Sequence, residues 1–127
     1  MATHTNLMQS TYLFGKAAED RAAHFFLSQN YHIRERNYRY RKAEVDLIVQ
    51  KGNLLVAVEV KARSTAFFGS PETFVRPKQR NLLVMAMDDY INRYNLDVDL
   101  RFDIMAYVYQ SGQWEETHIE NAFYPFT

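Results

Sequence analysis

Apolar residues recur at helical spacing in two parts of this chain. Over residues 11–29 they form a stripe three and four residues apart, which predicts a first helix capped by Ser10 or Thr11. A second apolar stripe follows Pro77, and because proline suits the first position of a helix, we expect a second helix to begin there. The glycine and proline within residues 64–76 predict a loop before that helix.

Five other stretches have the composition of strands. Residues 100–109 alternate cleanly between two faces, and residues 54–62 begin apolar on both faces, as a central strand does. Three consecutive strands favour an antiparallel meander, and the helix after them favours a crossover to a parallel neighbour. We therefore expect an α/β fold in which helices flank a mixed central sheet. The predicted strands are residues 31–39, 43–50, 54–62, 100–109 and 114–119.

Three carboxylates and a lysine lie within the most apolar of these strands. Gly52–Asn53 is a recognised two-residue hairpin loop, and it determines which residues face each other. With this loop, Asp46 lies directly across from Glu59, with Cβ atoms about 4.5–5.5 Å apart. By the same register Glu44 lies across from Lys61. A three-residue loop would instead point Asp46 away from Glu59, so the pairing depends on the turn.

Two interpretations of these charged residues remain open. Adjacent carboxylates repel each other and are costly to bury, and a divalent cation such as Mg²⁺ would relieve both penalties. Lys61 would then lie on the same face, where it could act on a water molecule or stabilise negative charge. Alternatively, Lys61 and a neighbouring arginine balance the carboxylates of Asp46 and Glu59 as a solvated ion pair without any metal.

Composition limits the class of protein. The chain has 127 residues, 47% of them apolar, which fits one compact domain and excludes a disordered chain. It has no cysteine, which excludes disulfides and thiolate metal sites. With no run of about 18 apolar residues, we expect a cytoplasmic protein without a membrane partner. We expect residues 1–10 to be a loose tail and residues 11–127 to form a single domain.

Charge is unevenly distributed although the net charge is zero. Residues 1–80 hold 13 Lys and Arg against seven Asp and Glu, and residues 81–127 hold two against eight. Basic residues interleaved with tyrosines in residues 34–42 suit phosphates and unpaired bases, or alternatively a charged edge strand that resists aggregation. The candidate nucleic-acid contacts are Arg39, Arg41, Lys42, Arg63, Lys78 and Arg80.

Two other polar residues are assigned structural roles. His118 lies in the short last strand and has no partner pattern typical of a metal ligand, so we expect a structural hydrogen bond. Asp103 lies between apolar neighbours, and we expect it to pair with Arg101 or with a loop amide.

The order of these residues resembles a known family. Asp46, twelve intervening residues and then Glu59-Val60-Lys61 resemble the D…(E/D)-x-K core of the restriction-endonuclease-like (PD-(D/E)XK) nucleases. More closely, the chain resembles the YraN-like family. Ala18 and Ala43 stand where that family usually has glycine. The motifs are Gly15–Glu19 (GKAAE), Glu44–Ile48 (EVDLI), Val58–Arg63 (VEVKAR), Phe68–Gly69, Arg101–Ile104 (RFDI) and His118–Phe123 (HIENAF).

This resemblance implies a restriction-endonuclease-like core and a role for each site residue. Asp46 and Glu59 would bind Mg²⁺ or Mn²⁺ together with the carbonyl of Val60, and Lys61 would be the catalytic base or charge stabiliser. Glu19 resembles the extra acid of Holliday-junction resolvases and would be an outer or second-metal ligand. For Glu44, the open alternatives are metal contact and pairing with Lys61 or Arg63.

The implied activity is hydrolysis of phosphodiester bonds in DNA, with branched and single-stranded DNA as candidate substrates. A homodimer would suit a junction resolvase. The alternatives are a nucleic-acid-binding module with a nuclease fold and little turnover, and a structural adaptor in which Glu59 and Lys61 form an ion pair.

Overall fold

The computed structural model describes residues 4–64 and 76–123, with side chains from Tyr12 onward, and contains two helices and five strands there. The predicted loop glycine and proline, Gly69 and Pro71, lie outside the described residues. The elements are α1 (His4–Ser28), β1 (His32–Tyr40), β2 (Ala43–Lys51), β3 (Leu54–Arg63), α2 (Pro77–Arg93), β4 (Asp99–Gln110) and β5 (Gln113–Ile119).

The first helix is longer than predicted. It begins at His4, so Ser10 and Thr11 lie inside the helix rather than at its cap, and residues 4–10 are helical rather than a loose tail. No glycine or proline interrupts these residues, and each residue added to an existing helix gains a hydrogen bond. Among the helices that the structure describes, none combines the length and apolar character needed to cross a membrane.

The sheet has the predicted mixed topology. Its strand order is β1-β2-β3-β4-β5, which makes β3 the central strand. The strands β1, β2 and β3 form an antiparallel meander, α2 provides the crossover, and β4 runs parallel to β3. The last strand, β5, pairs antiparallel with β4. The predicted α/β fold with a mixed sheet is therefore confirmed.

The two helices cover opposite faces of this sheet. Val56 and Val58 of β3 pack in a cluster with the small residues of α1, whereas Leu55 and Ala57 pack in a second cluster with α2. This follows from the strand period of two, which sends neighbouring side chains to opposite faces. Glu59 continues the Leu55 and Ala57 series, so it faces α2.

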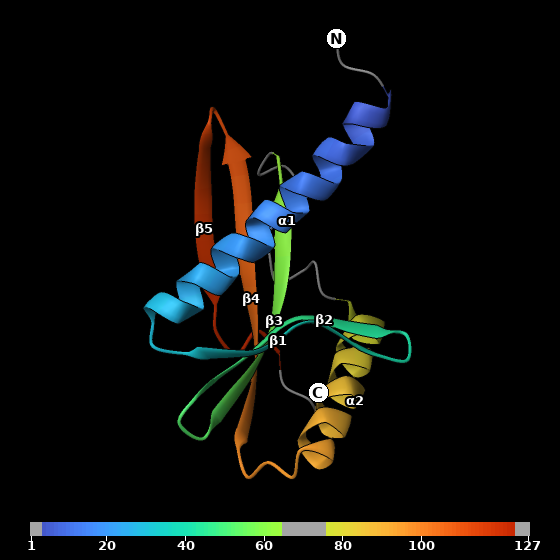
Figure 1. Ribbon diagram of the computed structural model, residues 1–127, viewed down its shortest axis with the longest axis vertical. Helices are drawn as coiled ribbons and strands as arrows, with labels where there is room; N and C mark the ends of the chain where they lie inside the picture. The colour runs from blue at the N-terminus through green and yellow to red at the C-terminus, as the bar shows by residue number, and fades with distance from the viewer. Residues whose placement is uncertain (1–3, 65–75, 124–127) are drawn as a thin grey trace.

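The sheet divides between β2 and β3, and this division creates the candidate site. The pairing runs from the Gly52–Asn53 turn to Leu47 opposite Val58, in the predicted register, and the paired positions stop there. Beyond that point β2 stays paired with β1 as far as Ala43, and β3 stays paired with β4 as far as Arg63. Figure 1 shows β1 and β2 running crosswise to β3, β4 and β5.

The turn glycine and the helix glycine should respond oppositely to substitution by alanine. Gly52 has a φ of +61°, so Gly52→Ala is expected to cost about 1 kcal/mol of folding free energy. Gly15 lies within α1, and an added Cβ there meets nothing within 4 Å, so Gly15→Ala should stabilise the protein by about 0.5–1 kcal/mol. Urea denaturation of both variants measures the two changes, and changes of the same sign would contradict this backbone assignment.

Candidate functional site

A cleft of about 360 Å³ opens where β2 and β3 separate. It is bounded by the ends of these two strands and by the first turns of α2. Three of its residues, Asp46, Glu59 and Lys61, are the ones that the sequence predicts as the chemical core, and the structure brings them together. The full lining is Lys42, Ala43, Glu44, Asp46, Glu59, Val60, Lys61, Gln79, Leu82 and Leu83.

The Asp46 side chain bridges the two separated strands. Its Oδ2 accepts a hydrogen bond from the backbone N–H of Val60 at 2.8 Å, so a carboxylate takes the place of a strand partner. Val45 packs in the α2 cluster and Leu47 in the α1 cluster, although they are two residues apart. We conclude that β2 twists sharply around Asp46, and this twist turns the Asp46 carboxylate toward β3.

Glu59 is 5% exposed and only half satisfied by its neighbours. Its Oε2 accepts a hydrogen bond from the Gln79 side chain at 2.9 Å and lies 4.0 Å from the ammonium nitrogen of Lys61. Its Oε1 is buried and has no hydrogen-bond partner among the described residues. A buried carboxylate oxygen without a partner is unfavourable, so this atom calls for a ligand or a proton.

Burial and mutual repulsion make these two carboxyl groups hard to ionise. Burial raises the pKa of Asp46 to about 6, against the hydrogen bond from Val60. Burial and then the nearby charge of Asp46 raise the pKa of Glu59 to about 8, against the attraction of Lys61. Both groups therefore hold protons more strongly than free carboxylic acids, and a bound cation would displace those protons.

The residues of the cleft fit a magnesium ion with few protein ligands. Among the side chains that the structure describes, in residues 12–64 and 76–123, no three His, Asp or Glu converge as a ready ligand set. Asp46 and Glu59 supply two carboxylates, and Mg²⁺ typically binds one or two carboxylates and keeps several waters. The unpartnered Oε1 of Glu59 is the atom that best fits such an ion.

The two other predicted acids lie outside this pair. Glu19 accepts a hydrogen bond from the Asn37 side chain at 3.3 Å, and it lines a second groove of about 440 Å³ rather than the cleft. Glu44 lines both the cleft and this groove, and its Oε2 forms an ion pair with Arg39 at 3.1 Å. The ion pair that the structure shows for Glu44 is with Arg39, whereas the predicted partners are Lys61 and Arg63. Metal contact by Glu19 stays a prediction.

The basic residues predicted to contact nucleic acid lie in different surroundings. Lys42 lines the cleft, and the Arg41 guanidinium lies 5.2 Å from the centre of the Tyr40 ring. Arg39 is engaged by Glu44, and Arg63 donates to the carbonyl of its own neighbour Ala62. Other arginines of β1 also form contacts within the protein, so the basic stretch of residues 34–42 has a partly structural role.

The first turn of α2 contributes a residue that the sequence analysis did not single out. Lys78 and Arg80 were expected to face the substrate, yet neither lines the cleft, and the Arg80 guanidinium lies 5.4 Å from the Phe123 ring centre. Gln79 between them does line the cleft and bonds to Glu59. The signal was present, since Gln79 lies one helical turn before the buried Leu83 on the same face.

A second buried charge cluster has the structural role predicted for it. Arg101 donates two hydrogen bonds to the fully buried carboxylate of Asp103, each 2.8 Å long. His118 Nε2 lies 2.7 Å from Asp103, and the backbone N–H of Asn121 donates at 3.0 Å. Burial raises the pKa of Asp103, but the hydrogen bonds from His118, Arg101 and Asn121 together hold it below its usual value.

Comparison with known proteins places the chain among bacterial relatives. Residues 18–107 match the model of the uncharacterised protein family UPF0102. The chain belongs to this family. The matched residues of the UPF0102 model run from Ala18 in α1 to Tyr107 in β4, so they include the whole cleft and all of its carboxylates.

Similar UPF0102 proteins cover most or all of the chain. One from Christiangramia forsetii is 44% identical over 99% of this chain and 100% of its own length. One from Flavobacterium psychrophilum is 43% identical over the same shares. A third, from Phocaeicola vulgatus, is 37% identical over 88% of this chain and 93% of its own. Their names state the UPF0102 family and no activity.

Proposed function

We propose that this UPF0102 protein is a Mg²⁺-dependent nuclease that hydrolyses phosphodiester bonds in DNA. The observation that carries the proposal is the buried, unpartnered Oε1 of Glu59, which lies in a cleft beside Asp46 and Lys61. A fold stabilised only by its internal contacts gains nothing from burying two repelling carboxylates. A site that binds a cation and a phosphate needs such a pair.

The arrangement of the elements supports the same proposal. The order of helix, three strands, helix and strand is similar to that of the PD-(D/E)XK nucleases, whose core motif Asp46, Glu59 and Lys61 also resemble. Fold alone does not determine activity. The residues that would carry the chemistry nevertheless lie together in the cleft, where β2 and β3 separate.

Each residue of the cleft has a definite role in this proposal. Asp46 and Glu59 would hold the metal with the carbonyl of Val60, and the metal when bound would polarise the phosphate and activate a water molecule. Gln79 keeps the Glu59 carboxylate oriented through its 2.9 Å hydrogen bond. The Lys61 nitrogen lies 4.0 Å from Glu59, where its ammonium form can stabilise the developing negative charge, or its neutral amine form can accept a proton. Lys42 supplies a cation for the substrate phosphate.

A second candidate function is nucleic-acid binding with little turnover. It is favoured because, within the described part of the chain, no third His, Asp or Glu joins Asp46 and Glu59 in an arrangement that could hold a metal ion. It also accommodates Glu19, which is held by Asn37 and lines the neighbouring groove. Metal binding separates the two functions, because only the nuclease requires an ion in the cleft.

Calorimetric titration with Mg²⁺ and with Mn²⁺ tests the proposed function. Wild type should bind the ion, and Asp46→Asn should weaken binding by about tenfold or more, because it removes one of two charged ligands. Asp20→Asn is the matched control, since Asp20 is an exposed carboxylate that pairs with Arg36 and Lys16. If wild type binds neither ion, with or without DNA present, the nuclease proposal fails and the binding module replaces it.

A further inference from the structure

An apolar hollow of about 200 Å³ lies next to the cleft, between the β1–β2 turn and α2. Its base is formed by Tyr40, Ala43, Leu82 and Met85. Met85 is 47% exposed although it lies on the middle of a helix, and it packs in neither core cluster. These side chains give the hollow an apolar lining, and the pockets that bind small ligands are lined mainly by apolar side chains.

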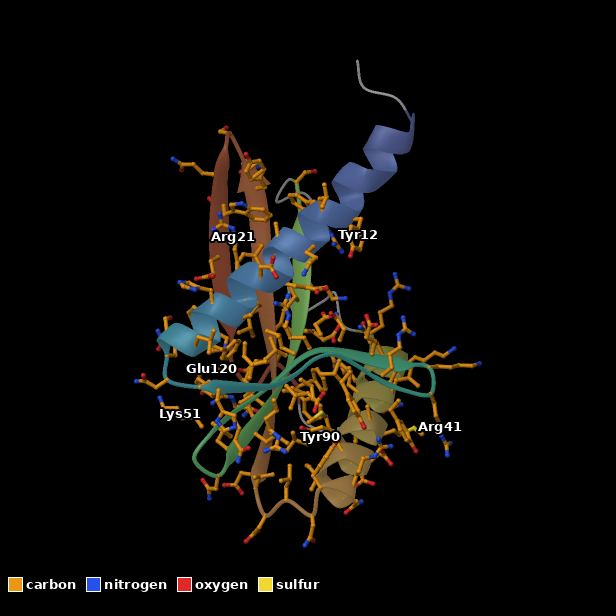
Figure 2. The ribbon with its side chains drawn as sticks, in the orientation of Figure 1. Tyr12, Arg21, Arg41, Lys51, Tyr90 and Glu120 are labelled. Atoms are coloured by element: carbon orange, nitrogen blue, oxygen red, sulfur yellow. The ribbon has the colours of Figure 1, made fainter. Side chains whose placement is uncertain are left out.

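The rim of this hollow is positively charged. Arg41 and Lys42 complete its lining, and both lie in the turn at the end of the β1–β2 hairpin. Among the described residues neither forms an ion pair with a carboxylate, and Arg41 lies over the Tyr40 ring. Figure 2 shows Arg41 at that end of the hairpin, close to α2. A ligand for this hollow should therefore combine an apolar part with negative charge.

The hollow and the cleft form one continuous surface. Lys42, Ala43 and Leu82 line both of them. The hollow is smaller than the roughly 300–1,000 Å³ of typical pockets for drug-sized ligands, so it suits a single ring system. A nucleotide has a flat base attached to an anionic phosphate, and it matches an apolar hollow that adjoins a cleft holding Lys42, Lys61 and the proposed metal site.

We propose that this hollow binds one unpaired nucleobase beside the phosphate held in the cleft. The proposal rests on the proposed function and names its substrate class, which is nucleic acid with unpaired nucleotides. A base within an intact duplex is stacked and paired, so entering the hollow would require flipping it out at additional cost. In a single strand or at a branch the base is free, and it can stack on Tyr40 and Met85 while Arg41 and Lys42 contact the flanking phosphates.

The test compares Met85→Glu with Leu27→Glu. Leu27 is 51% exposed, is also helical and does not line the hollow, so the control makes the same chemical change elsewhere. The probes are a short fluorescein-labelled single strand and the blunt duplex of the same sequence. Their binding is followed by fluorescence anisotropy, with no metal added and again with Ca²⁺. Met85→Gln is a second variant, which keeps the length of the side chain if the glutamate variant does not fold.

Wild type should bind the single strand more tightly than the duplex. Met85→Glu should weaken single-strand binding by about tenfold and leave duplex binding unchanged, because one stacked base is lost. Leu27→Glu should change neither affinity.

Three results would overturn this inference. Equal affinity of wild type for both probes would refute the base-binding hollow, and so would equal affinities of Met85→Glu and Leu27→Glu for the single strand. In either case the nuclease proposal would survive if metal-dependent cleavage persists. If Met85→Glu dissociates a dimer in light scattering without changing affinity, a second copy of the chain covers the hollow. If wild type binds neither probe under either condition, the base-binding hollow and the proposed function both fail.

Discussion

Asp103→Ala should lower the free energy of unfolding by about 3–5 kcal/mol, because it leaves a buried cation without its partner. The Asp103 carboxylate is fully buried, and it receives two hydrogen bonds from Arg101, one contact from His118 and one hydrogen bond from the Asn121 amide. Its removal leaves the Arg101 guanidinium without this carboxylate, and the Arg101 side chain is only 18% exposed. It also removes the side-chain contacts that join β4 to His118 of β5 and to the backbone of Asn121 in the turn after it.

Urea denaturation with linear extrapolation measures this change. Asp20→Ala provides the control, because Asp20 forms a short ion pair with Arg36 at 2.7 Å but its side chain is 53% exposed. That variant should lose no more than about 1 kcal/mol, as solvent-exposed pairs do. A loss below about 1 kcal/mol for Asp103→Ala would show that Asp103 is not essential to the packing of β4 against β5.

Glu59→Gln should make the metal-free protein more stable at pH 8 and, on the proposed function, should strongly reduce metal-dependent cleavage. Because folding raises the pKa of Glu59 to about 8 and that of Asp46 to about 6, the folded protein keeps protons that the unfolded chain has released above about pH 4 to 5. Stability therefore falls as the pH rises from about 4 to about 8. The glutamine side chain is neutral over this whole pH range, so Glu59→Gln should remove the larger part of this loss of stability.

The expected difference depends on pH. At pH 5 wild type and Glu59→Gln should be similar in stability, and at pH 8 the variant should be more stable by about 2 kcal/mol. Denaturation at both pH values, with metal removed by a chelator, measures the difference. Cleavage of DNA in Mg²⁺ should fall on the order of 10³-fold, because a charged ligand is lost.

Glu115→Gln is the control for this prediction, since Glu115 is an exposed carboxylate on β5. It should change neither the pH dependence nor the cleavage rate. A Glu59→Gln variant that is less stable than wild type at both pH values would indicate a purely structural Glu59. Its ion pair with Lys61 would then be its main role, as in the adaptor interpretation.

Local turn chemistry made the centre of the site predictable from sequence. Gly52 adopts the positive φ that a tight hairpin turn requires, and its neighbour Asn53 completes a two-residue loop. This loop sets the register of β2 against β3 as far as Leu47 opposite Val58. The predicted pairs Asp46–Glu59 and Glu44–Lys61 lie beyond the last paired position, and the Asp46 carboxylate instead reaches β3 through the Val60 amide. The apolar alternation of β4 was equally informative, because one set of its alternate side chains, Phe102, Ile104 and Ala106, packs in the same cluster as α2.

Features that depend on three-dimensional packing were not predictable in the same way. The division of the sheet after Leu47 arises from the twist of β2, which no short motif encodes. The pairing of Glu44 with Arg39 depends on the β1–β2 turn, where Arg41 adopts a φ of 55° that glycine or asparagine more often signals. Gln79 was overlooked because the basic residues on either side of it carry the more familiar signal for phosphate binding.

The division of the sheet also bears on how this protein avoids aggregation. Beyond Val58, the edge of β3 that faces β2 has no strand partner among the described residues, and an open strand edge is a template for a strand from another chain. Here that edge borders Asp46, Glu59 and Lys61, and an inserted apolar strand would have to bury their charges. The residues proposed for catalysis thereby also protect the interior edge that their own geometry leaves open.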